Sequence, residues 1–79
     1  MLNENSSKSL YRQLYKIISD KIKNHTYNAG DKIPSENELS KRYGVNRHTA
    51  RMGLQKLKED GLIYSKKGKG YFVANIKVP

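Results

Sequence analysis

The first quarter of the chain carries apolar and aromatic residues at helical spacing. Between Ser9 and about His25 they recur every three or four positions, at Tyr11, Leu14, Tyr15, Ile18 and Ile22. Asn24, Asn28 and Gly30 then break the pattern. The spacing predicts a first helix of about four turns. Residues 31–34 are expected to be extended, because Pro34 disfavours helical backbone in the residue before it.

A capping box predicts that a second, short helix starts at Ser35. The Ser35 hydroxyl can accept a hydrogen bond from the Glu38 amide, and the Glu38 carboxylate can accept one from the Ser35 amide. Gly44 can take the left-handed conformation that closes a helix, and Asn46 is a good N-cap for the next one. Two helices joined by such a short turn form a helix-turn-helix.

The third predicted helix runs from Asn46 to residue 59 or 60 and has two chemically different sides. One side carries small and apolar residues, namely Ala50, Gly53, Leu54 and Leu57. The other side carries positive charge and hydrogen-bond donors, at Arg47, His48, Arg51, Gln55 and Lys58. This second face suits a nucleic-acid groove, but a solvated basic surface has the same composition. The helix alone does not decide between them.

Two short β-rich runs around a glycine-bearing loop predict a hairpin after Gly61. The runs cover residues 62–65 and 71–74, and the loop between them reads Lys-Lys-Gly-Lys-Gly. Gly68 and Gly70 allow positive φ and close approach to another surface, and the lysines favour a negatively charged one. Lysines at a hairpin tip can also protect an edge strand against aggregation. The first interpretation makes the hairpin a wing.

The positive charge is concentrated in the second half of the chain. The net charge is +9, and residues 1–40 hold six basic and five acidic side chains, whereas residues 41–79 hold ten and two. A generally solubilising surface would spread this excess more evenly. The distribution favours one surface that faces a polyanion.

Length and composition exclude several function classes. A chain of 79 residues makes one small domain, in which a deep catalytic cleft is not expected. It has no cysteine, and its two histidines cannot form a metal site alone. No nucleophile with a base and no phosphate loop is evident, so we expect neither an enzyme nor a cofactor. No run approaches the length of a membrane span and no signal peptide is evident, which predicts a cytoplasmic protein without a membrane partner.

From Leu10 to Val73 four motifs follow in order: Gly-Asp-x-Ile-Pro-Ser-Glu, Gly-Val-x-Arg-x-Thr-x-Arg, Asp-Gly-Leu-Ile and Gly-x-Gly-x-Phe-Val. This order resembles the DNA-binding domain of GntR-family transcription factors, and Glu-Asn-Glu-Leu looks most like the HutC-type branch. The resemblance implies an α+β fold, a winged helix-turn-helix with three helices and a small antiparallel β-hairpin wing. It also implies binding to palindromic operator DNA as a two-fold dimer.

The resemblance also implies roles for single residues. Arg47 and Arg51 match arginines that contact bases or phosphates, and Thr49 matches a residue that fixes the helix on the DNA backbone. Gly68 matches the glycine of the wing tip that enters the minor groove. Tyr11 matches an aromatic position that touches the DNA backbone in some relatives, although its place on the apolar stripe also fits a core residue. The other five tyrosines are expected to be packing residues, with only Tyr71 at the wing left open.

The chain departs from the commonest family pattern at several positions. Asn37 stands where many members have arginine, so it could contact adenine or only phosphate. Asn46 replaces a frequent serine and preserves the cap, while Gly53 replaces a frequent alanine and is expected to allow close approach of the first helix. His48 is variable and could contact DNA or only solvent. The candidate DNA-binding residues are Tyr11, Ser35, Asn37, Asn46, Arg47, His48, Thr49, Arg51, Lys67, Gly68, Lys69 and Gly70.

The domain organisation follows from the same resemblance. Residues 1–8 are expected to be a flexible N-terminus, residues 9–74 the winged helix-turn-helix, and residues 75–79 the start of a linker. Similar GntR-family proteins carry a C-terminal domain that binds a small effector and dimerises. We therefore expect the operator-binding module of a bacterial repressor released by an effector. The alternatives are a protein-interaction winged helix and a non-specific nucleic-acid binder, neither of which would prefer a particular duplex.

Overall fold

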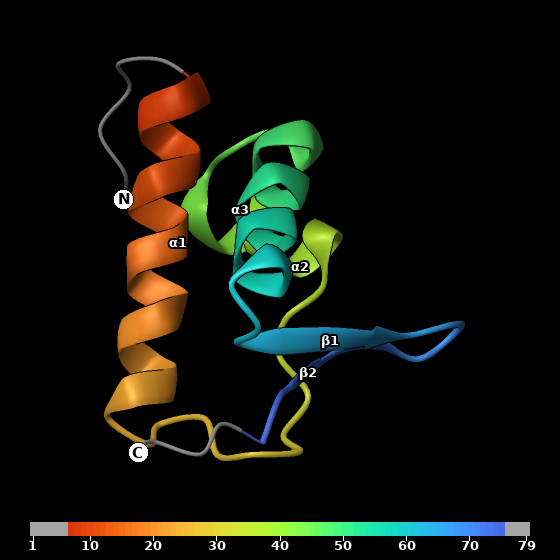
Figure 1. The fold of residues 1–79 in the computed structure, drawn as a ribbon. Coiled ribbons are helices and arrows are strands. Elements are labelled where there is room, and N and C mark those ends of the chain that lie inside the picture. Colours follow the sequence, from red (N-terminus) through yellow and green to blue (C-terminus); the bar gives the residue numbers. More distant parts are fainter. Residues whose placement is uncertain (1–6, 76–79) are drawn as a thin grey trace.

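The computed structural model describes residues 7–75, and of residues 7–9 only the backbone. It contains three helices, α1 (Ser7–Lys23), α2 (Glu36–Tyr43) and α3 (Arg47–Glu59), and two strands, β1 (Ile63–Lys66) and β2 (Gly70–Val73) (Figure 1). This confirms the predicted order of elements. The first helix begins two residues earlier than the Ser9 expected from the apolar stripe. The expectations for residues 1–6 and 76–79 lie outside the described residues.

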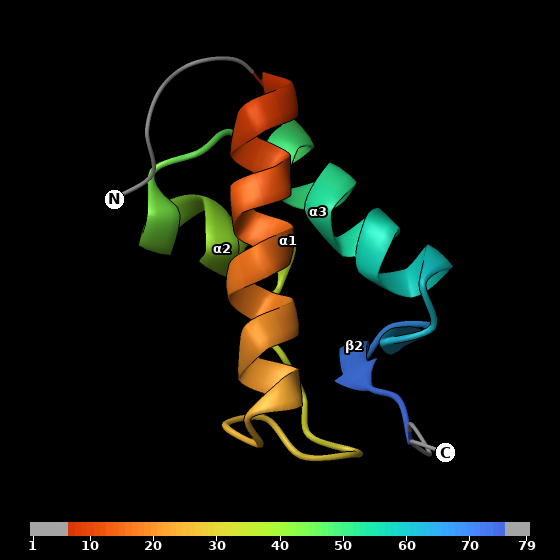
Figure 2. The same ribbon diagram turned by 60° about the vertical axis from the view of Figure 1, so that its left-hand side comes forward.

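The core lies where the apolar sides of the three helices meet the inner face of the hairpin. In Figure 2, α1 stands in front, with α2 on one side and α3 on the other. The buried apolar residues come from every element and from the extended segment, and they are Leu14, Ile18, Ile22, Ile33, Leu39, Val45, Ala50, Leu54, Leu57, Ile63 and Val73. Burial of the predicted stripes in α1 and α3 is what holds the three helices together. None of the described helices is both long enough and apolar enough to cross a membrane.

The predicted caps of the helix-turn-helix are present. The Ser35 hydroxyl accepts from the Glu38 amide at 3.2 Å, and the Glu38 carboxylate accepts from the Ser35 amide at 3.0 Å. These hydrogen bonds hold the pKa of Glu38 below its usual value. Gly44 closes α2 with φ of 67°, and the Asn46 side chain accepts from the Thr49 amide at 2.7 Å to start α3. The turn between the two helices is thus fixed at both ends.

The C-terminal end of α3 is tied to α1 by a hydrogen bond. The Tyr15 hydroxyl donates to the Asp60 carboxylate, and Lys56 lies 3.5 Å from the same carboxyl group. The hydrogen bond lowers the pKa of Asp60 and raises the pKa of Tyr15. Tyr15 thus packs against the core with its ring and joins two helices with its hydroxyl.

The extended segment before α2 forms a third strand-like edge of the sheet. β1 and β2 pair in antiparallel register, with Tyr64 opposite Phe72. On the other side of β2, the Ile33 amide donates to the Tyr71 carbonyl at 3.0 Å, and the Val73 amide donates to the Asp31 carbonyl at 2.9 Å. The sequence predicted an extended segment but not this pairing. It places the start of α2 beside the hairpin.

Gly53 lies at the contact between α3 and α1, as expected. A Cβ atom at this position would lie 3.4 Å from Leu14 Cδ2 and 3.5 Å from the Tyr11 carbonyl oxygen. Both distances are ordinary van der Waals contacts. The close approach of the two helices therefore tolerates alanine as well as glycine.

We therefore expect Gly53→Ala to stabilise the domain. Alanine is about 1 kcal/mol better than glycine inside a helix, and its methyl group fits the available space. Urea unfolding should show a free energy of unfolding higher by about that amount. Gly44→Ala is the matched control and should lower stability, because Gly44 has φ of 67°. A destabilised Gly53→Ala variant would contradict the contact described above.

The carboxylates of Glu38 and Asp60 predict a loss of stability in acid. Their folded pKa values are depressed, so their stabilising effect is present above the unfolded pKa and is lost as the pH falls through the folded pKa. The double variant Glu38→Gln, Asp60→Asn keeps acceptor groups at both sites but does not titrate. Its melting temperature should fall less between pH 5 and pH 3 than that of the wild type. Equal falls would show that these two groups do not contribute.

Candidate nucleic-acid interface

The first turn of α3 presents three of the predicted residues to solvent. Arg47, His48 and Arg51 are exposed, while the opposite side of the same turn is buried. Asn46 is also exposed; its side-chain oxygen accepts the cap hydrogen bond, and its NH₂ group can donate to another partner. The division of α3 into two faces, predicted from its sequence, is therefore confirmed.

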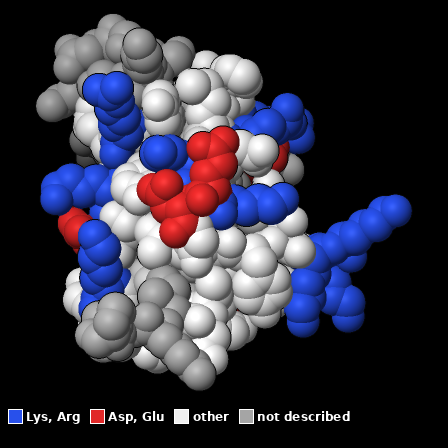
Figure 3. Space-filling view, in the orientation of Figure 1, with Lys and Arg blue, Asp and Glu red and all other residues white. Residues whose placement is uncertain are grey.

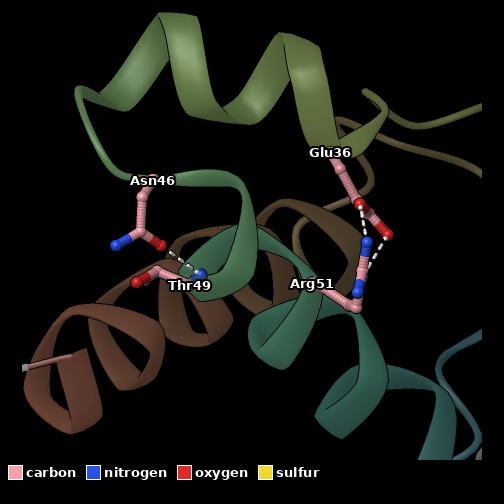
Figure 4. Close-up of polar contacts among 4 residues, drawn as sticks. All are labelled: Glu36, Asn46, Thr49 and Arg51. Atoms are coloured by element: carbon pink, nitrogen blue, oxygen red, sulfur yellow. Dashed lines mark hydrogen bonds and ion pairs between the residues drawn. The ribbon is translucent and has the colours of Figure 1, made fainter.

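Arg51 is held in place by Glu36 at the start of α2. Its Nε donates to one Glu36 carboxylate oxygen at 3.1 Å and its Nη2 to the other at 3.2 Å (Figure 4). The Arg51 side chain nevertheless stays 58% exposed, whereas that of Glu36 is 20% exposed. The hydrogen bond raises the pKa of Arg51. Because a guanidinium has five N–H donors, the edge formed by Nη1 and the second hydrogen of Nη2 remains available to a ligand.

Glu36 is a partner of a candidate site residue that the sequence did not reveal. Of the two carboxylates in the first turn of α2, Glu38 completes the capping box. Glu36 instead turns toward α3 and fixes the direction of Arg51. The sequence shows a carboxylate at the first position of one helix and an arginine on the exposed face of the next. Only the three-dimensional structure shows that the two side chains are in contact.

Thr49 differs from its expected role. Its side chain is fully buried, and its Oγ1 has no hydrogen-bond partner within the part of the chain that the structure describes. A contact between this hydroxyl and the DNA backbone is therefore not available in this conformation. Thr49 lies on the same side of α3 as Ala50 and Gly53, so the helix start is fixed by packing and by the amide of Thr49 on Asn46.

At the start of α2, Asn37 follows Glu36, the partner of Arg51, in the sequence. Asn37 is exposed, while Ser35 is half-buried and its hydroxyl and amide are both engaged in the capping box. Asn37 therefore remains a candidate for contact with a ligand through its side chain. Ser35 contributes to the site mainly by positioning α2.

The hairpin tip has the geometry predicted for a wing. Lys67, Gly68 and Lys69 are exposed, and the turn is closed by a hydrogen bond from the Lys69 amide to the Lys66 carbonyl at 2.9 Å. Gly68 and Gly70 have φ of 76° and 111°, the region that favours glycine. In Figure 3 basic side chains extend from the hairpin at the right-hand edge, away from the acidic residues of that face.

The outer face of the hairpin carries an aromatic pair. The rings of Tyr64 and Phe72 stack with centroids 5.8 Å apart, and the Lys66 amine lies 5.2 Å from the Phe72 centroid. Tyr64 thus packs as expected, but it stays 37% exposed. Tyr71 packs partly buried against the core, which favours a packing role for it.

Tyr11 is half-buried in a shallow groove between α1 and α3. It lines this groove together with Met52, Gln55, Lys56 and Glu59. This position agrees with both interpretations of Tyr11, because its ring packs between the helices while the groove remains open to solvent.

Known proteins have sequences similar to this one. The family model described as bacterial regulatory proteins, gntR family, matches residues 10–73. The HTH-type transcriptional regulator YurK of Bacillus subtilis is 45% identical over 78 residues, which cover 99% of this chain and 32% of that protein. The probable fructoselysine utilization operon transcriptional repressor of Escherichia coli is 40% identical over 73 residues, covering 92% of this chain and 30% of the repressor. The chain thus spans about a third of the length of these two relatives.

Two solved structures are similar to this one in both fold and sequence. The DNA-binding domain of AraR in complex with an operator has a TM-score of 0.83 at 38% identity, over 94% of this chain and 92% of that one. A transcriptional antiterminator from Listeria monocytogenes has a TM-score of 0.87 at 32% identity, over the whole of this chain and 59% of that one. The chain therefore belongs to the GntR family of bacterial regulatory proteins and folds as that family's winged helix-turn-helix DNA-binding domain.

Proposed function

We propose that this domain binds double-stranded operator DNA sequence-specifically as the operator-binding part of a bacterial transcriptional repressor. The observation that carries the proposal is the exposed first turn of α3, where Glu36 aims a partly exposed Arg51 away from the core. In Figure 1 α2 lies beside α3, and the hairpin extends outward from below the C-terminal end of α3. The AraR domain, whose fold is similar, is described in complex with operators, and several relatives are named as repressors.

The residues divide into base-reading and phosphate-contacting groups. Arg47 and Arg51 are suited to bases, since an arginine fork matches the two acceptors on the major-groove edge of guanine. The wing lysines Lys67 and Lys69 are suited to phosphates, and Gly68 between them allows close approach to the minor groove. His48 and Asn37 are also exposed and are the candidates for setting the particular operator.

The whole protein would act through parts beyond this domain. We infer that the domain pairs as a two-fold dimer on a palindromic operator, and that a C-terminal domain binds a small effector which releases the repressor. This part of the proposal rests on membership of the family and on the fact that the chain spans only about a third of the length of two of its relatives. Assignment to the HutC-type branch and a place on the cytoplasmic nucleoid belong to the same proposal.

The affinity for duplex DNA should depend steeply on salt. The slope of log affinity against log salt concentration should be about −0.9 multiplied by the number of phosphates that the protein neutralises, which we expect to be about 5–8 per domain. Fluorescence anisotropy of a labelled duplex between 50 and 200 mM salt measures this slope. A protein-interaction module would show a flat dependence on DNA and no preference for duplex DNA over heparin.

The two groups of residues should differ in their effect on specificity. Arg51→Ala is expected to reduce discrimination between a duplex selected from a random pool and an unrelated duplex by about 1–3 kcal/mol. Glu36→Gln should reduce it in the same direction by less, because the guanidinium loses its orientation but keeps its donors. Lys67→Ala should weaken both duplexes by the same factor. If all three variants lost discrimination equally, these roles would be wrong.

A further inference from the structure

The sheet has an outer face to which the segment before α2 also contributes. Along β1 and β2 the residues Ile63 and Val73 point into the core, whereas the pair Tyr64 and Phe72 lies on the opposite face. Lys32 forms an antiparallel bridge with Phe72. Because residues directly opposite each other in a sheet share a face, Lys32 lies on the outer face with the aromatic pair.

The Lys32 side chain leans toward the tip of the wing. A Cβ atom at Gly70 would lie 3.2 Å from Lys32 Cε and 4.0 Å from its amine nitrogen. Gly70 is two residues nearer the tip than Phe72, the bridge partner of Lys32. The end of the Lys32 side chain therefore lies close to the space that a side chain at position 70 would enter. Gly70 provides this space in addition to its positive φ.

The charges around Lys32 are mostly positive. Lys66 is the strand partner of Gly70 on the same face, and the exposed Lys67 and Lys69 follow at the tip. Glu38 is the acidic group whose charge interacts with Lys32, but its carboxylate already accepts the Ser35 amide. No ion pair to Lys32 is found among residues 10–75. An anion placed on this face would therefore meet several amines and little competition.

We propose that Lys32 is a phosphate-contacting residue of the wing, which the fold adds to the DNA-binding surface from a distant part of the sequence. Lys32 comes shortly before Ser35 and Glu36 in the chain, and its Cε lies beside the wing strand, 3.2 Å from the position that a Cβ of residue 70 would take. It thus lies between the start of α2 and the wing tip, two surfaces that carry proposed DNA contacts. The inference rests on that proposed function and names one further contact to the sugar-phosphate backbone.

A substitution that removes the charge of Lys32 but keeps the shape of its stem tests the proposal. Lys32→Met keeps an unbranched stem beside Gly70 but removes the amine. It should weaken binding to the selected and the unrelated duplex by the same factor, roughly fivefold to tenfold at 0.1 M salt, and lower the salt slope by about 0.9. Lys32→Arg should restore the slope, because it restores the positive charge. Lys16→Met is the matched control on α1, where Lys16 pairs with Asp20, and should leave affinity and slope unchanged.

The outcomes separate this proposal from the one on which it rests. A salt slope of Lys32→Met equal to that of the wild type, with normal wild-type binding, would overturn the role of Lys32 and leave operator binding intact. A selective loss on the selected duplex alone would also overturn it, because phosphate contacts carry no sequence information. Failure of the wild type itself to bind duplex DNA would instead reject the proposed function.

Discussion

The burial of one side of α3 against α1 is the constraint on which the rest of the site depends. Leu54 and Leu57 are almost completely buried, and Gly53 brings the α3 backbone close to Leu14 of α1. Once this side is fixed in the core, the helical period forces Arg47, His48 and Arg51 to the opposite side. The exposed basic face is therefore a consequence of core packing. Its direction is determined by apolar contacts that no ligand needs to touch.

The ion pair between Glu36 and Arg51 contributes more to geometry than to stability. An ion pair whose arginine is this exposed contributes little to folding, because water solvates the separated guanidinium well. Its two parallel hydrogen bonds, however, restrict the guanidinium to one direction before any ligand arrives. Fewer rotamers are then lost when the outer edge of the fork engages a partner. A carboxylate beside an arginine that is proposed to read DNA thus need not oppose binding, provided that it leaves this edge free.

Features that depend on neighbouring residues could be predicted from the sequence. The capping box of Ser35 and Glu38, the cap at Asn46 and the left-handed Gly44 each require only a few consecutive residues, and all were confirmed. The two-sided pattern of α3 also predicted its burial, because a helix repeats its faces at a fixed interval. The order of elements and the family followed from these local signals together.

Thr49 shows where the resemblance outweighed a local signal. Its position four residues before Gly53 already placed it on the apolar stripe, but the family pattern suggested a contact with DNA. The hydrogen bonds between Glu36 and Arg51 and the approach of Lys32 to the wing strand are different, since each joins segments that only the complete fold brings together. Pairing of residues 31–33 with β2 connects the start of α2 to the wing by backbone hydrogen bonds. Because Glu36 of α2 also holds Arg51 of α3, the start of α2, the exposed face of α3 and the wing are linked to one another. A partner that engages one of these three surfaces meets the other two already in position.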